Sequence, residues 1–128
     1  MQTVARHQRQ TKHVLLVEAP SGSRDRHAET LARHQYDVTL ADDVDAAKKL
    51  WAAEHFGLVI LSLDGFANSA GLLCDEIRDS DPGQIIALIF NPDQELPATD
   101  CPTLIFTTEP DEYFLARVET LTAAAFAA

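Results

Sequence analysis

Three polar residues follow apolar runs in this chain, and their side chains are the first candidates for chemistry. Ser62 and Asp64 lie in the segment GLVILSLDG, and Glu18 directly follows the run HVLLV. A serine hydroxyl is a poor nucleophile without a general base, whereas a carboxylate can itself accept a transferred group. Asp64 lies two residues beyond Ser62, so both side chains face the same side if the strand stays extended. An ordinary turn before Gly65 is the simpler interpretation of Asp64.

The other clusters of potential metal ligands have structural interpretations. The segment ADDVD, residues 41–45, is rich in acids, but acids also favour the start of a helix through its dipole, and Asp43 is a plausible N-cap. The five histidines are scattered without metal-ligand spacing. His27 and His34 are seven residues apart and can share a helix face, where we expect solvated or half-buried positions.

The apolar pattern predicts the strands that position these residues. Short, nearly continuous apolar runs are typical of strands covered on both faces of a sheet. The alternating segment Tyr36–Leu40 fits a strand nearer an edge. The continuous runs are His13–Val17, Leu58–Leu63, Ile85–Phe90 and Thr103–Thr107.

Helical periodicity fills the intervals between most of these strands. Residues 91–102, NPDQELPATDCP, are the exception, because three prolines leave room for one short turn at most. The first two predicted helices are Ser23–Gln35 and a segment that carries Val44, Ala47, Leu50, Trp51 and Ala53 at helical spacing. The third runs from Asn68 to Ser80 with Leu72, Leu73, Cys74 and Ile77 inward, and the last from Asp111 to Ala125 with Phe114, Leu115, Val118 and Leu121 on one stripe.

Strands that alternate with helices predict an α/β fold. We expect a flavodoxin-like three-layer sandwich, in which a five-stranded parallel sheet has the order 2-1-3-4-5 and the fourth helix is shortened or missing. Ligands of such folds bind at the carboxyl ends of the strands, where Glu18 and Ser62 fall.

Length and charge limit the function classes. The chain has 128 residues, the size of one domain, and its net charge of −10 argues against nucleic acid as a direct partner. We expect a flexible basic arm at residues 1–12 and one domain at residues 13–125. No apolar run suits a membrane span or a secretory signal, and two cysteines suggest neither disulfides nor zinc, so we expect a cytoplasmic protein. Cys74 is expected to pack, and Cys101 is the cysteine to test for reactivity.

Several of these segments, in this order, resemble the receiver domain of bacterial two-component response regulators. The resemblance covers residues 12–122. Its most specific parts are GLVILSL at residues 57–63, GLLCDEIR at residues 71–78 and FLARV at residues 114–118.

The resemblance implies an acceptor and a metal site that this sequence lacks in part. Receivers accept a phosphoryl group from a histidine kinase on an Asp at the end of the third strand, and that Asp holds Mg²⁺ together with two acids after the first strand. The acceptor position falls on Ser62, and the acid pair falls on Glu18 and Ala19. Only Glu18 keeps a carboxylate there.

The residues that report phosphorylation in the family are also replaced. The Thr or Ser of the fourth strand aligns with Ile89, and the Lys of the fifth strand aligns with Thr107. The aromatic switch residue aligns with Leu104. An aliphatic side chain cannot hydrogen-bond a phosphoryl oxygen, and a threonine supplies no positive charge.

We therefore expect a degenerate receiver, or pseudo-receiver, that is not an enzyme, needs no cofactor and acts as a phosphorylation-independent interaction module in bacterial signalling. Its expected partners are a histidine kinase, a response regulator or an output protein, and a homodimer is a further option. One alternative is a phosphoacceptor that uses Asp64 or Ser62 with Glu18 and Mg²⁺. Another is a receiver-like domain that senses a small ligand. The expected partner surface combines residues 91–102 with the exposed side of residues 109–121, and its acidic members are Asp93, Glu95, Asp100, Glu109 and Glu112.

Overall fold

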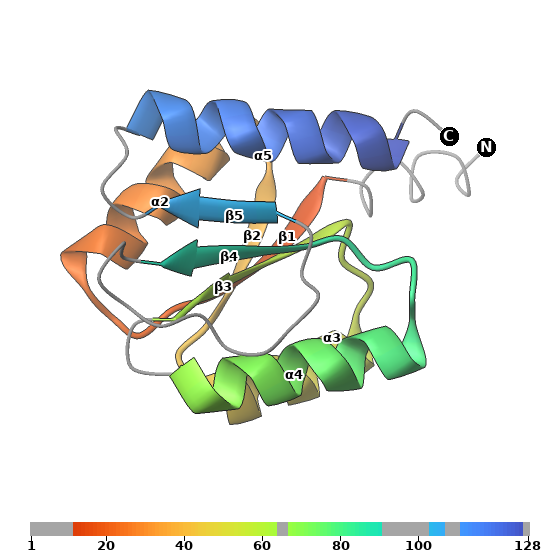
Figure 1. Cartoon of the computed structure of the whole chain (residues 1–128). Coiled ribbons are helices and arrows are strands. Elements are labelled where there is room, and N and C mark those ends of the chain that lie inside the picture. The colour runs from red at the N-terminus through yellow and green to blue at the C-terminus, as the bar shows by residue number, and fades with distance from the viewer. Residues whose placement is uncertain (1–11, 64–66, 91–102, 107–110, 127–128) are drawn as a thin grey trace.

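The computed structural model of the chain describes residues 12–63, 67–90, 103–106 and 111–126 (Figure 1). Strands and helices alternate along most of this length, as predicted. In chain order, the elements are β1 (His13–Val17), α2 (Gly22–Arg33), β2 (Asp37–Ala41), α3 (Val44–Ala53), β3 (Leu58–Ser62), α4 (Ala67–Ser80), β4 (Ile86–Phe90), β5 (Thr103–Phe106) and α5 (Asp111–Phe126).

The five strands form one parallel sheet in the order β2-β1-β3-β4-β5, which confirms the predicted topology. The weakly apolar strand β2 lies at one edge, as its alternating sequence predicted. The proline-rich connection at residues 91–102, where a shortened or missing helix was expected, lies outside the described residues, and so do residues 1–11 of the basic arm.

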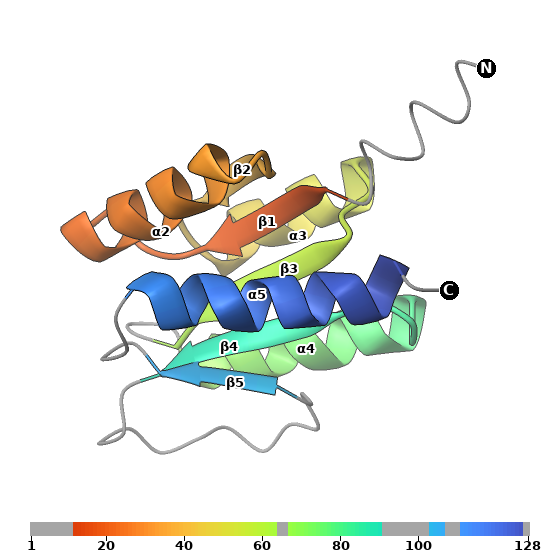
Figure 2. The same ribbon diagram turned by 90° about the horizontal axis from the view of Figure 1, so that it is seen from above.

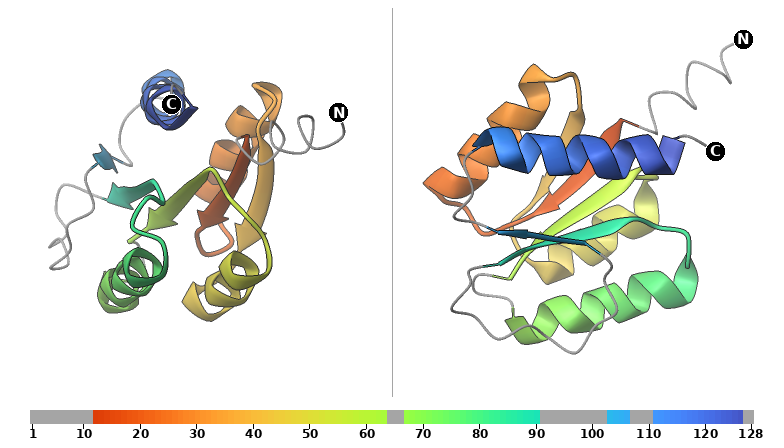
Figure 3. Two further views of the ribbon diagram at one scale, coloured as in Figure 1. Left: turned by 90° about the vertical axis from the view of Figure 1, so that its right-hand side faces the viewer. Right: turned by 45° about the horizontal axis from the view of Figure 1, so that its top comes forward.

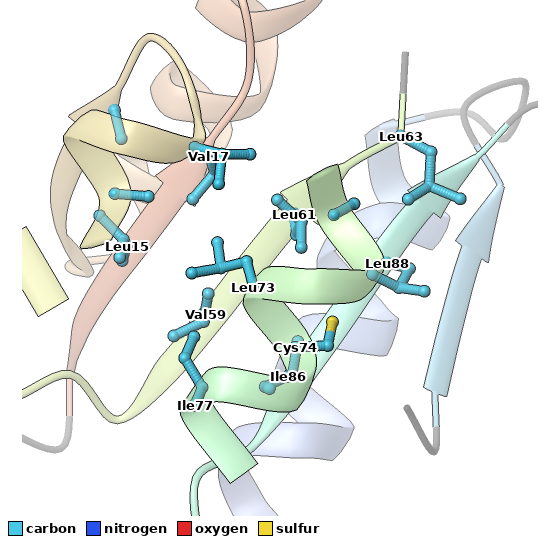
Figure 4. Close-up of a cluster of buried hydrophobic side chains, with 14 of the residues drawn as sticks. Leu15, Val17, Val59, Leu61, Leu63, Leu73, Cys74, Ile77, Ile86 and Leu88 are labelled. Atoms are coloured by element: carbon cyan, nitrogen blue, oxygen red, sulfur yellow. The ribbon is translucent and has the colours of Figure 1, made fainter. Parts of the chain in front are cut away.

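Helices cover both faces of the sheet, with α2 and α5 on one side and α3 and α4 on the other (Figures 2 and 3). Because side chains alternate along a strand, each strand contributes to two cores. Leu15, Val59 and Leu88 pack in the core beneath α3 and α4 (Figure 4). Their neighbours Leu16 and Ile60 pack in the core beneath α2 and α5.

Side-chain caps start two of the helices. The Ser21 hydroxyl accepts a hydrogen bond from the Arg24 N–H, and the Asp43 carboxylate accepts one from the Ala46 N–H at 2.8 Å. These bonds satisfy backbone donors that the first turn of a helix leaves without partners. The predicted N-cap role of Asp43 is thereby confirmed.

The sequence pattern of α4 gave a wrong prediction for one residue. Leu72 was expected to point inward but is 64% exposed. Leu73, Cys74 and Ile77 are buried as predicted (Figure 4). Ala70 is buried as well, so the buried stripe of α4 includes Ala70 and not Leu72. Because successive residues lie about 100° apart around a helix, positions 70, 73, 74 and 77 share one face, whereas position 72 lies roughly opposite that face.

Candidate functional site

Three of the predicted site residues meet where the strands end. The register pairs Val17 with Leu61 and Ser62 with Ile89, so Glu18 follows β1 at the level of Ser62. The Glu18 N–H donates to the Ala41 carbonyl of β2 at 3.1 Å, which continues the ladder one residue beyond β1. Glu18, Ser62 and Ile89 are all buried, with exposures of 5%, 1% and 0%.

The α2 side of the sheet supplies a partner for the Glu18 carboxylate. His27 of α2 donates from Nδ1 to Glu18 Oε1 at 2.9 Å, and the His27 side chain is itself buried. Phe114 comes from α5, the other helix on this face of the sheet. Its ring stacks on the His27 imidazole, with ring centroids 4.5 Å apart and an interplanar angle of 29°. A strand end and two helices therefore meet at one buried contact (Glu18, His27 and Phe114).

His27 corrects an expectation from the sequence, which placed the histidines at solvated or half-buried positions. His27 is 5% exposed, whereas His34 is exposed beyond the end of α2. The signal in the sequence was the spacing of His27 and Leu31, since residues four apart on a helix share a face and Leu31 is fully buried. The partner Glu18 could not be read from spacing, because the two residues meet only after the chain turns from β1 into α2.

The described residues at this edge do not fit Mg²⁺. A hard dication requires several oxygen ligands. Here Ala19 supplies no side-chain ligand, Ser62 supplies a neutral hydroxyl, and the Glu18 carboxylate already accepts a hydrogen bond from His27. Among the described residues, no group of three or more His, Cys, Asp and Glu side chains is arranged to hold a metal ion.

The acids that follow β2 have structural partners. Asp43 caps α3, and Asp42 forms an ion pair with Arg24 of α2. The helix-start interpretation of residues 41–45 therefore accounts for Asp43, while Asp42 ties the end of β2 to the first turn of α2.

The remaining predicted site residues are divided between the described and undescribed parts of the chain. Ala19 is half-buried, Leu104 pairs with Leu88 in the sheet, and Glu112 is exposed at the start of α5. Six further predicted residues lie outside the described residues: Asp64, Asp93, Glu95, Asp100, Thr107 and Glu109. Cys74 is buried as expected, and Cys101 lies in an undescribed range.

Comparisons with known proteins identify the fold. No family model and no curated protein matches the sequence. The signal receiver domain of an HD domain-containing protein from Pseudomonas fluorescens Pf-5 is 20% identical, with a TM-score of 0.76 over 91% of this chain and 98% of that one. The response regulator protein TrrA from Thermotoga maritima, in complex with Mg²⁺ and BeF, is also 20% identical, with a TM-score of 0.75 over 85% of this chain and 97% of that one.

A longer protein shows the same likeness. NtrX from Brucella abortus, in complex with ADP, is 19% identical, with a TM-score of 0.77 over 88% of this chain. The match covers 26% of the NtrX chain, so this chain spans about a quarter of it. At these identities the comparisons show the fold, which is that of response regulator receiver domains.

No helix within the described ranges is both long enough and apolar enough to cross a membrane.

Proposed function

We propose that this chain is a pseudo-receiver, which binds signalling proteins of a bacterial two-component system without being phosphorylated. The observation that carries the proposal is the buried contact between Glu18 and His27 at the edge where receivers hold Mg²⁺. The acid that remains from the metal site is engaged by a side chain of the chain itself. We infer that the chain is not an enzyme and needs no cofactor.

The residues around this contact support the same conclusion. Phosphoryl transfer to a receiver needs a carboxylate acceptor, and the metal neutralises the charge that develops during transfer. Ser62 has a hydroxyl in place of that carboxylate, and Ile89 beside it has no hydrogen-bonding group in its side chain. A phosphoryl group placed here would meet neither a metal nor a reporting hydroxyl from these two strands.

The packing of α5 supports a binding function without a phosphorylation step. Phe114 stacks on His27, and the Thr122 hydroxyl forms a hydrogen bond of 3.0 Å with the Tyr36 hydroxyl. These two buried contacts hold α5 near both of its ends against α2 and the start of β2. The exposed residues Glu112 and Tyr113 are thus presented on a helix whose position depends on internal packing.

The phosphorylation half of the proposal is tested with a small phosphodonor. The full chain is incubated with Mg²⁺ and acetyl phosphate, and its intact mass is measured beside that of a receiver with the complete set of acids. We expect an adduct on the control receiver and none on this chain. An adduct on this chain that is lost in Asp64→Asn or Ser62→Ala would overturn the proposal and identify the acceptor.

The binding half is tested on the exposed side of α5. The wild-type chain and the Glu112→Lys variant are each used to capture proteins from a bacterial lysate. Mass spectrometry then identifies the captured histidine kinases, response regulators and output proteins. Asp75→Lys on α4, across the sheet, is the matched control for the change in charge. We expect Glu112→Lys alone to lose such partners. If both variants capture the same signalling proteins, α5 is not part of the partner surface.

A further inference from the structure

Residues of α3 and α4 line a groove along the seam between the two helices. These helices lie on the face of the sheet away from α5 (Figure 3). The groove consists of three adjoining hollows of about 240, 200 and 370 Å³. The first two share Lys48 in their linings, and the last two share Trp51, Ala52 and Ser80. The hollows therefore adjoin one another along the seam, from the start of the two helices to their ends.

Apolar side chains line the groove along its length. Leu72 lines the hollow at the helix starts and is 64% exposed, the largest exposure of a large apolar residue within the described part of the chain. Leu73 and Ile77 line the middle hollow from the core side. Trp51 is half-buried and lines two of the hollows, and its indole N–H donates to Gln84 Oε1 at 3.0 Å. That hydrogen bond fixes the ring as a wall of the groove.

The charge of the groove is strongly negative. Among the described residues that line it, Lys48 is the one lysine, and its ammonium group already pairs with Glu76 at 3.2 Å. Carboxylates lie at both ends and in the middle. They belong to Asp43, Asp45, Glu54, Glu76 and Asp81.

We propose that this groove binds a basic segment of a partner protein, in which Lys or Arg residues flank one or two apolar side chains. The apolar residues would contact Leu72 and Trp51, and the cationic residues would pair with the groove carboxylates, those at the two ends and Glu76 in the middle. From Asp45 to Ala53, α3 rises about 12 Å, which an extended segment of about four residues would span. The groove is not lined by Glu18, by His27 or by described residues of α5, so it does not depend on the proposed function.

Charge selects this occupant over others. A second copy that placed its own groove here would bring two sets of carboxylates together, which is repulsive. Nucleic acid is repelled for the same reason. A short basic segment satisfies both the apolar lining and the unbalanced carboxylates.

The test begins with a displayed library of random twelve-residue peptides, selected against the full chain. We expect enriched peptides to carry an excess of Lys and Arg next to Leu, Phe or Trp. Trp51 is the only tryptophan of the chain, so its fluorescence reports directly on occupancy of the groove. Synthetic versions of the enriched peptides without tryptophan are then titrated against the protein. No enrichment, or enriched peptides without basic residues, would overturn the proposal.

Two matched pairs of variants locate the binding. Glu76→Lys changes a groove carboxylate, and Asp75→Lys makes the same charge change on an exposed neighbour that lines none of the three hollows. We expect Glu76→Lys to weaken peptide binding about tenfold and Asp75→Lys to change it less than about twofold, because an ion pair acts at short range. Leu72→Ser and Tyr113→Ser form the second pair, since both side chains are exposed, and only the Leu72 change should weaken binding. Equal effects within each pair would overturn the proposal.

Two further outcomes would assign the groove to another occupant. The full chain with Arg6→Glu and Arg9→Glu tests its own N-terminal residues, which carry basic side chains and no acid. If that variant binds the peptides more tightly, the groove is occupied by the chain's own N-terminal segment and not by a partner protein. Sedimentation experiments test for a dimer. A dimer that Glu76→Lys abolishes and Asp75→Lys preserves would show that the groove binds a second copy of the chain. Unchanged peptide binding and a monomer in both cases support the proposal.

Discussion

At the scale of single residues, the most consequential contact is the hydrogen bond between Glu18 and His27. Both side chains are 7% exposed, so each has lost most of its water. A buried polar pair contributes little beyond an apolar pair of the same shape, but either member left alone carries a full desolvation cost. An apolar substitution of either residue therefore lowers the stability of the fold as long as the other polar side chain remains buried.

This asymmetry predicts the result of a double-mutant cycle. Glu18→Leu and His27→Leu should each lower the free energy of unfolding by about 3 kcal/mol, because each leaves the other polar group buried without its partner. The double variant should lose less than the sum of the two, since no unpaired polar group remains. Urea denaturation monitored by circular dichroism measures all four proteins. Additive losses would show that the two side chains do not depend on each other.

At the scale of elements, α5 is held by a few buried side chains on one stripe. Phe114 and Val118 are 2% and 0% exposed, whereas the adjacent Tyr113 is 56% exposed. Phe114 contacts His27, so the helix packs directly on the residue that engages Glu18. The orientation of α5 is thereby coupled to the carboxyl edge through a ring stack.

Neighbouring aromatic residues of α5 allow a controlled test of that packing. Phe114→Ala should destabilise the fold by about 3–4 kcal/mol, because it removes a fully buried aromatic ring and leaves a cavity. Tyr113→Ala, one residue away on the exposed side, should change stability by less than about 0.5 kcal/mol. Thermal and urea unfolding compare the two variants. A similar loss in both would mean that α5 does not dock through the Phe114 side.

At the scale of the whole molecule, the chain combines a receiver fold with a high negative charge. The net charge of −10 makes the folded protein repel itself, and salt screens that repulsion. A receiver with a working metal site gains further stability from bound Mg²⁺, as any ligand of the folded state stabilises it. The two effects can be separated by comparing salts.

We expect the melting temperature to rise modestly with ionic strength and to be the same in MgCl₂ and NaCl at matched ionic strength. The described residues at the carboxyl edge do not fit a dication, so Mg²⁺ should act only as a screening ion. Differential scanning fluorimetry measures the shift, with CaCl₂ as a control for divalent screening. An additional rise in MgCl₂ that Glu18→Gln removes would establish a specific metal site.

The sequence alone determined the architecture, namely five parallel strands and their order in the sheet. Continuous apolar runs such as Leu58–Leu63 predict parallel strands, because covering a strand on both faces removes the polar alternation. Tyr36–Leu40 predicted an edge strand because its apolar and polar residues alternate, as in a strand that is not covered on both faces. The positions of Ser62, Ala19 and Ile89 followed from chain order, since each lies at or near the end of a strand.

Tertiary structure alone decided how the retained acid is used. Glu18 and His27 lie nine residues apart, in a strand end and a helix, and no local spacing rule brings them together. Phe114 reaches the same site from the last helix. The outward position of Leu72 was likewise decided by how α4 rotates onto the sheet. Patterns of hydrophobicity specify which elements form, whereas the packing of those elements against each other specifies which side chains meet.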